Sequence, residues 1–172
     1  RISAGGRLES VKRTPDEQRE RSFDLGSWSL GGLWAFQPGY GLGLTGSLAQ
    51  RAPSTEELYS SGPHEATRTY DIGNPEFRKE TSRNLELTLQ KTEGLVRWKA
   101  NLFYNRVKNF VYGDITGRQF DDEGNPGDEL NERIFRQGDA TIRGAEAEIG
   151  YNQRGSGWSG RLFADTSRGK LE

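Results

Sequence analysis

Seven segments of the chain alternate apolar and polar residues with a period of two, and this alternation constrains the fold more than any other feature. In RNLELTLQK (residues 83–91), Leu occupies every second position from 85 to 89, with Glu and Thr between. Successive side chains of a β-strand point to opposite faces, so the pattern predicts strands with one apolar and one polar face. No segment shows convincing helical periodicity. The segments are residues 1–10, 27–37, 41–50, 83–91, 96–105, 143–151 and 158–167.

The connections between these segments alternate in length. Long connections span residues 12–26, 51–82 and 112–139, whereas short ones span 38–40, 92–94 and 154–157. In an up-and-down meander, consecutive connections lie at opposite ends of the sheet, so every long connection falls on one side. We therefore predict one all-β domain over residues 1–172, an antiparallel up-and-down meander of about seven strands. An odd number of strands with two open edges suggests part of a larger barrel.

Two architectures accommodate such alternation. A soluble sandwich or propeller buries the apolar face, whereas an outer-membrane barrel turns that face to lipid and the polar face to its interior. The barrel is favoured because the segments are nine to eleven residues long, the length that a tilted strand needs to cross a bilayer. The low apolar content of 31% also fits a fold without a dry core. Aromatic residues at segment ends predict interfacial girdles: Trp28, Tyr40, Tyr104, Tyr151 and Trp158.

Several functional classes are disfavoured by composition. The chain has no cysteine, which excludes disulfides and thiolate metal sites within it. A net charge of −1 argues against nucleic-acid binding. No nucleophile–base pair, phosphate loop or paired-carboxylate geometry can be recognised, so we expect no enzymatic activity. Methionine is also absent, and we expect the chain to be a segment of a longer polypeptide.

The long connection at residues 51–82 carries the most specific signal. RAPSTEELYSSGPHEAT (51–67), followed by YDIGNPEFRKETSRNLELTL (70–89), resembles a segment in the barrel of TonB-dependent outer-membrane receptors. NLFYNRVKNFVY (101–112), TIRGAEAEIGY (141–151) and LFADTSRGKLE (162–172) resemble later strands of the same family. The resemblance thus covers most of the chain.

The resemblance implies a barrel of about twenty-two strands in the bacterial outer membrane, with the long loops extracellular. It also implies contact with lipid, with an N-terminal plug domain of the same protein and, through the plug, with the inner-membrane TonB complex. The implied function is energy-coupled uptake of a scarce nutrient, a metal ion or metal complex. Zinc is favoured as the ligand, with haem or a ferric siderophore next. A structural or protein-binding role and a passive porin are the alternatives.

His64 is the sharpest candidate site residue. It is the only histidine, and it lies in the middle of the long connection, where an external ligand can reach it. Imidazole is the commonest protein metal ligand and suits zinc or haem iron. GPHEAT (62–67) resembles zinc- and copper-type receptors, and haem receptors place a functional histidine between boxes similar to RAP and NPEF. Glu65 and Asp71 are nearby carboxylates, but a tetrahedral zinc site needs further ligands from elsewhere.

Other charged residues receive structural interpretations. Glu80, Thr81 and Ser82 are expected to hydrogen-bond the long connection onto the strand below. The acidic stretch at residues 117–132 is interpreted as a solvated loop, because its spacing matches no EF-hand. The charged residues of the polar strand face are expected to form cross-strand ion pairs and to contact a plug: Arg7, Glu9, Glu86, Arg97, Lys99, Glu146, Glu148, Arg161 and Asp165.

Overall fold

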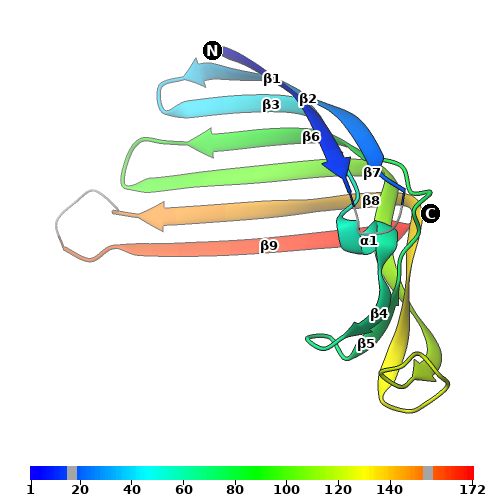
Figure 1. The fold of residues 1–172 in the computed structure, drawn as a ribbon. Helices are drawn as coiled ribbons and strands as arrows, with labels where there is room; N and C mark the ends of the chain where they lie inside the picture. The colour runs from blue at the N-terminus through cyan, green and yellow to red at the C-terminus, as the bar shows by residue number, and fades with distance from the viewer. Residues whose placement is uncertain (15–18, 153–156) are drawn as a thin grey trace.

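The computed structural model describes residues 1–14, 19–152 and 157–172, and it is almost entirely β-structure (Figure 1). The single described helix, α1, covers Thr55–Tyr59. The strands are β1 (Ile2–Arg13), β2 (Arg21–Gln37), β3 (Tyr40–Arg51), β4 (Ser61–His64), β5 (Thr69–Ile72), β6 (Glu80–Lys91), β7 (Val96–Phe120), β8 (Leu130–Tyr151) and β9 (Gly160–Leu171). Among the described residues, no helix is long and apolar enough to span a membrane.

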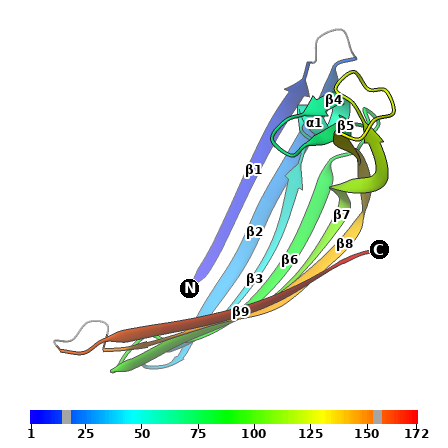
Figure 2. The ribbon, with the colours of Figure 1, turned by 90° about the horizontal axis from the view of Figure 1, so that it is seen from below.

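Seven of these strands form the predicted meander. β1, β2, β3, β6, β7, β8 and β9 pair antiparallel, each with its neighbour in this order. The sheet is curved, and β1 and β9 form its two open edges (Figure 2). The all-β, up-and-down prediction is therefore confirmed.

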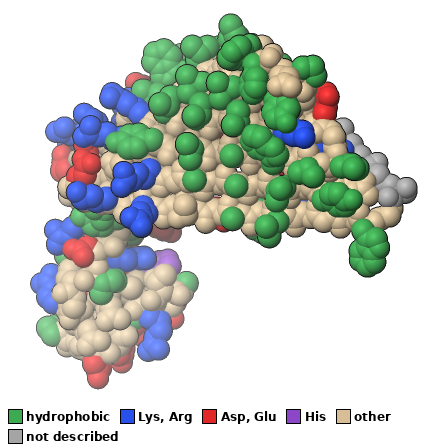
Figure 3. Space-filling view, turned by 180° about the vertical axis from the view of Figure 1, so that it is seen from behind, with side chains coloured by type: hydrophobic (Ala, Val, Ile, Leu, Met, Phe, Trp, Pro, Cys, Tyr) green, Lys and Arg blue, Asp and Glu red, His purple; other side chains and the backbone are tan. Residues whose placement is uncertain are grey.

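The two faces of the sheet differ as the alternation predicts. Leu44 of β3 and Leu87 of β6 lie at one register position of what we call the apolar face, which Figure 3 shows covered by hydrophobic side chains. Thr88, Asn101 and Glu146 share a register position on the opposite, polar face. Large apolar side chains along the apolar face are exposed, so the main sheet alone provides no partner for them.

The short connections gather at one end of the sheet. Gly39 and Gly94 adopt positive φ angles of 74° and 88° in two of these turns, a conformation that glycine adopts without steric cost. The third predicted turn, at residues 154–157, lies largely outside the described residues. Aromatic rings cluster at this end, with Tyr40 6.1 Å from Phe36 and 6.4 Å from Trp98 between ring centroids.

The long connections are more ordered than the sequence indicates. The segment between β3 and β6, residues 52–79, was predicted to be a long connection without strands or helices of its own, and the structure corrects this point. It contains α1 and the β4–β5 hairpin, and we call it the insertion. β7 and β8 also continue far beyond the expected nine to eleven residues, to 25 and 22 residues. The connection expected at residues 112–139 is thus mostly a long hairpin.

The hydrophobic core lies under the insertion and not in the middle of the sheet. Phe23 and Leu25 of β2 pack there with Leu58 of α1 and Phe77 of the insertion. Glu9 and Leu25 are register partners on the polar face, so the insertion covers the end of that face. The hydrophobic core is therefore formed with the insertion, a segment that the sequence predicted to be only a connection.

Candidate ligand-contacting surfaces

The base of the insertion is held by one arginine. Arg51, the last residue of β3, donates from Nε to Glu80 Oε2 at 2.6 Å, and Glu80 is the first residue of β6. Its two terminal nitrogens donate to the Glu57 carboxylate at 3.0 and 3.1 Å. The other oxygen of Glu80 accepts from the Val111 backbone N–H at 2.6 Å. The insertion is therefore tied at both of its ends and to β7, as was expected for Glu80.

Helix α1 begins with a capping box. The Ser54 hydroxyl accepts from the Glu57 backbone N–H at 3.1 Å, and the Glu57 carboxylate accepts from the Ser54 N–H at 2.8 Å. This reciprocal pair satisfies two amide groups that a short helix leaves open. Leu58 of the same turn is completely buried. The sequence STEEL thus folds α1 locally and anchors it in the core.

The GNPEF stretch packs directly against α1. The Asn74 N–H donates to the Glu57 carbonyl at 3.0 Å, and Phe77 is buried in the core. A Cβ added at Gly73 would lie 2.7 Å from the backbone of Leu58 and Tyr59. Such an approach is closer than real Cβ contacts, so only glycine fits this position.

The β4–β5 hairpin pairs with the first residues of β8, at the end of the sheet away from the short turns. β5 pairs with β8 in parallel register, Asp71 opposite Arg133. Arg133 Nε donates to Asp71 Oδ1 at 2.9 Å, and its NH2 group contacts Oδ2. Nearby, the buried carboxylate of Glu132 accepts from Arg118 Nε at 2.8 Å. The Asp71–Arg133 pair therefore fixes the hairpin to the extended β7–β8 arm, which is visible in Figure 1, whereas the Arg118–Glu132 pair joins the two strands of the arm.

His64 ends β4 and begins a chain of side-chain contacts. His64 Nδ1 lies 2.9 Å from Thr67 Oγ1, which lies 2.7 Å from Thr69 Oγ1. The Thr69 hydroxyl donates to Asp71 Oδ1 at 2.6 Å. Two threonine hydroxyls thus connect His64 to the Asp71–Arg133 pair. Glu65 is exposed beside His64.

The described residues contain no group of three or more His, Cys, Asp or Glu side chains arranged to hold a metal ion. The oxygens of Asp71 are already engaged by Arg133 and Thr69. The structure therefore places His64, Glu65 and Asp71 on one hairpin without bringing them into one coordination sphere. Their roles as metal ligands stay predictions.

The acidic stretch at residues 117–132 is divided by the structure. Residues up to Phe120 belong to β7 and those from Leu130 belong to β8. Asp121 closes the turn between them, since its carboxylate accepts from the backbone N–H groups of Asn125 at 2.8 Å and Glu123 at 3.0 Å. These bonds, the one from Asn125 first, hold the pKa of Asp121 below its ordinary value.

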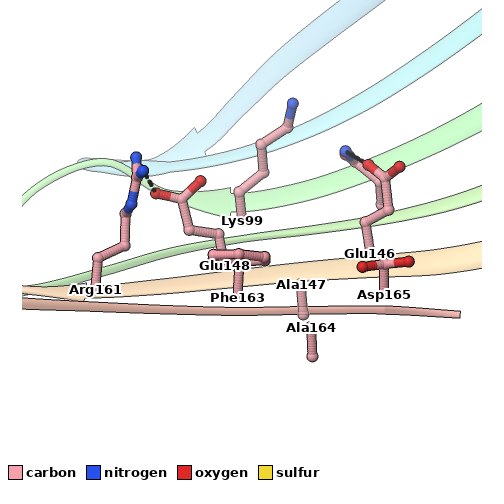
Figure 4. A pocket seen from close by; sticks show the side chains of 9 residues that line it. Lys99, Glu146, Ala147, Glu148, Arg161, Phe163, Ala164 and Asp165 are labelled. Atoms are coloured by element: carbon pink, nitrogen blue, oxygen red, sulfur yellow. Dashed lines mark hydrogen bonds and ion pairs between the residues drawn. The ribbon is translucent and has the colours of Figure 1, made fainter.

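A polar hollow lies on the polar face near the β9 edge. Figure 4 shows Lys99 of β7, Glu146 and Glu148 of β8, and Arg161 and Asp165 of β9 projecting on the same side. Arg161 NH1 lies 3.6 Å from Glu148 Oε1 across the strand pair. Such a mixed-sign surface can hydrogen-bond a polar partner but offers no pocket of reactive groups.

Part of the predicted ion pairing of this face is present. The Arg161–Glu148 pair crosses from β9 to β8 as predicted, whereas Arg7 NH2 lies 2.8 Å from Glu9 Oε2 within β1 and forms no cross-strand pair with it. Arg97 Nε is a buried side-chain nitrogen without a hydrogen-bond partner among the described residues. A buried donor without an acceptor lowers the stability of the fold, so the surface around Arg97 needs an acceptor that the described residues do not supply.

Comparison with known proteins identifies the family. The family model described as "TonB dependent receptor-like, beta-barrel" matches residues 1–169. The chain belongs to this family, whose members are outer-membrane receptors.

Solved structures share the fold at low sequence identity. The copper transporter OprC is 21% identical with a TM-score of 0.73, over 98% of this chain and 26% of that chain. The FrpB iron transporter of Neisseria meningitidis is 17% identical with a TM-score of 0.69, over 99% of this chain and 23% of that chain. The siderophore receptor PirA of Pseudomonas aeruginosa is 16% identical with a TM-score of 0.57, over 99% and 40%. The chain therefore spans about a quarter of the length of the first two.

The sequence contains no local signal for the two buried ion pairs, Arg118–Glu132 and Asp71–Arg133. Arg118, Glu132 and Arg133 lie in a stretch interpreted as a long connection, and neither TGRQF (116–120) nor ERIF (132–135) alternates apolar and polar residues. The partner of Asp71 could not have been found, because it lies 62 residues away.

Proposed function

We propose that this chain forms part of the transmembrane barrel of an outer-membrane receptor for energy-coupled uptake, with the insertion and the β7–β8 arm facing outward. The family match over residues 1–169 carries the proposal. The apolar face supports it, since exposed leucine and tryptophan side chains form a surface that suits lipid. The aromatic cluster at the turn end matches an interfacial girdle.

The polar face is proposed to contact a plug domain of the same full-length protein. Arg97 Nε lacks a hydrogen-bond partner among the described residues, and a polar partner can supply one. The mixed-sign hollow beside it presents charged groups that the same partner can bind. Energy coupling would then reach this barrel through the plug and an inner-membrane TonB complex. A structural barrel or a passive porin would not require a plug domain.

The proposed ligand is a metal ion or metal complex, with zinc first and haem or a ferric siderophore next. His64 supports this choice because its Nδ1 is engaged by Thr67, so a Nδ1–H tautomer leaves Nε2 as a free metal ligand. Glu65 is exposed beside it, whereas Asp71 serves better as the residue that positions Thr69. Further ligands would come from other loops or from the plug.

Calorimetric titration of the full-length receptor in detergent with zinc tests the ligand proposal. The His64→Ala variant is compared with Glu76→Ala, which alters an exposed carboxylate of the same insertion. We expect zinc binding that weakens at least tenfold in His64→Ala and is unchanged in Glu76→Ala. An unchanged affinity in His64→Ala removes this residue from the site, and absence of zinc heat moves the proposal to haem or a ferric siderophore. If none of the three binds, the structural role is favoured.

A further inference from the structure

A group of basic side chains lies on the apolar face, at the end near the insertion. Arg83 of β6, Arg106 of β7 and Lys170 of β9 lie at one level, with Thr141 of β8 between the last two. Arg143 and Arg168 lie one level closer to the short turns, beside Tyr104. Figure 3 shows Lys and Arg side chains gathered at this end, next to the hydrophobic side chains of the apolar face. We call the group the basic row: Arg83, Arg106, Arg143, Arg168 and Lys170.

The basic row contains two pairs of directly opposed arginines. Arg83 is the register partner of Arg106, and Arg143 is the register partner of Arg168. Like charges directly opposite each other on neighbouring strands are destabilising. Such pairs become favourable when an anion lies between them, because two guanidinium groups can then share it.

The described residues supply little counter-charge. Arg106 NH2 lies 3.9 Å from Asp139 and 3.6 Å from Glu172, both long contacts. Arg83, Arg143 and Arg168 form no ion pair with any described carboxylate, and all three are exposed. The charge of the basic row is thus largely uncompensated by this part of the chain.

The position of the row relative to the apolar surface indicates what supplies the anion. Leu85, Leu87 and Leu89 of β6 begin directly below Arg83 and are exposed. On β7, Arg106 lies eight residues from Trp98 of the aromatic cluster. At about 3.3 Å per residue and a tilt of roughly 40°, this separation is about 20 Å of depth, close to the ~25 Å apolar band of such barrels.

We propose that the basic row binds the phosphate groups of a membrane lipid whose acyl chains lie along the leucines below. Guanidinium groups recognise phosphate through paired hydrogen bonds, and exposed leucines beneath them suit hydrocarbon. A free phosphate ion would use the arginines but not the apolar surface. This inference rests on the membrane placement given under Proposed function, and it adds a lipid-selective site to it.

The test uses the full-length receptor in a neutral detergent, titrated with dioleoyl phosphatidic acid and monitored by native mass spectrometry. Dioleoyl phosphatidylcholine is the zwitterionic control, and inorganic phosphate is added as a competitor. The test variant is Arg143→Gln with Arg168→Gln. The matched control is Arg68→Gln with Arg78→Gln, which removes two exposed cations of the insertion.

We expect selective binding of phosphatidic acid that weakens at least tenfold in the Arg143/Arg168 variant, since each basic residue near an anionic surface contributes about a fivefold factor. The Arg68/Arg78 variant should bind like the unmodified receptor, and phosphate at the lipid concentration should not compete. Equal binding of both lipids, equal loss in both variants, or displacement by phosphate alone would each overturn the lipid site. A receptor that does not insert into liposomes at all would instead contradict the membrane placement itself.

Discussion

Arg51 and Glu80 lie opposite each other at the last register position of β3 and β6, and the 2.6 Å bond between them closes the insertion at its base. The twenty-eight residues between them leave the sheet and return to it at the same point. Glu57 is held by the same guanidinium group, so α1 is attached to the closure. The residues that identify the family in this segment are thus those that give the insertion its shape.

Replacing Glu80 should release the insertion while leaving the main sheet folded. Glu80→Ala removes the acceptor for both Arg51 and the Val111 N–H. Leaving the buried Val111 N–H unpaired costs about 1–3 kcal/mol of local stability. Limited proteolysis of the full-length receptor should show faster cleavage within residues 52–79. Glu76→Ala, an exposed glutamate of the same insertion, is the control, and equal cleavage rates in the two variants would contradict this role.

Gly73→Ala should disrupt the packing of α1 more than any other glycine substitution in the insertion. The added Cβ meets backbone atoms of Leu58 and Tyr59, which cannot move without displacing the buried Leu58 side chain. Overpacking of this kind costs about 1–3 kcal/mol. Gly62→Ala is the matched control, because its Cβ would meet nothing within 4 Å. Hydrogen exchange of residues 54–60 should rise in Gly73→Ala alone; protection as in the unmodified receptor would refute the packing argument.

Asp71→Asn separates a structural role from a metal-binding role. Breaking a buried ion pair by removing one charge costs about 3–5 kcal/mol, because Arg133 keeps an unpaired charge. We expect the β4–β5 hairpin to detach from β8, which hydrogen exchange of residues 69–72 can report. Glu65→Gln removes an exposed carboxylate of the same hairpin and should leave exchange unchanged. Reduced zinc affinity in Asp71→Asn with full protection of β5 would show instead that Asp71 is a ligand.

Acid should destabilise the turn at Asp121. The pKa of this carboxyl is lowered in the folded chain by the hydrogen bonds that it accepts from backbone N–H groups, so the unfolded form binds a proton more readily. Its stabilising contribution is therefore complete above the ordinary aspartate pKa of about 3.9 and is lost as the pH falls through the lowered value. Exchange of the Asn125 amide should stay slow at pH 5 and rise only in stronger acid. Asp121→Asn should abolish this dependence; a transition well above pH 4 would contradict it.

The sheet could be predicted from the sequence because period-two alternation is a local property. The alternation of Leu85, Leu87 and Leu89 predicts β6 from its own residues alone. The alternating lengths of the connections predict the order of the strands in the sheet. The expected strand ends were less accurate. β7 and β8 continue past the apolar stretch, where polar residues such as Arg118 and Glu132 pair with each other instead of alternating with leucine.

The insertion could not be predicted in the same way, because its order depends on distant partners. The capping box of Ser54 and Glu57 is visible in STEE, yet a single helical turn is unstable without the core that Phe23 and Phe77 supply. His64 could be singled out from the sequence as the one histidine, and its role as a ligand stays a prediction. Its link to Asp71 through Thr67 and Thr69 requires the fold of β4 and β5.

Residue-by-residue accessibility along β6 tests the central claim most directly. The chain contains no cysteine, so single cysteines at 85, 86, 87, 88 and 89 can carry a nitroxide label in the full-length receptor, with any other cysteine replaced, in liposomes. We predict that labels at 85, 87 and 89 are relaxed by oxygen dissolved in the lipid, and that those at 86 and 88 are shielded from it. Equal relaxation of all five labels by a water-soluble nickel chelate would show that this face does not meet lipid, and would contradict the assignment of the chain to a membrane-spanning barrel.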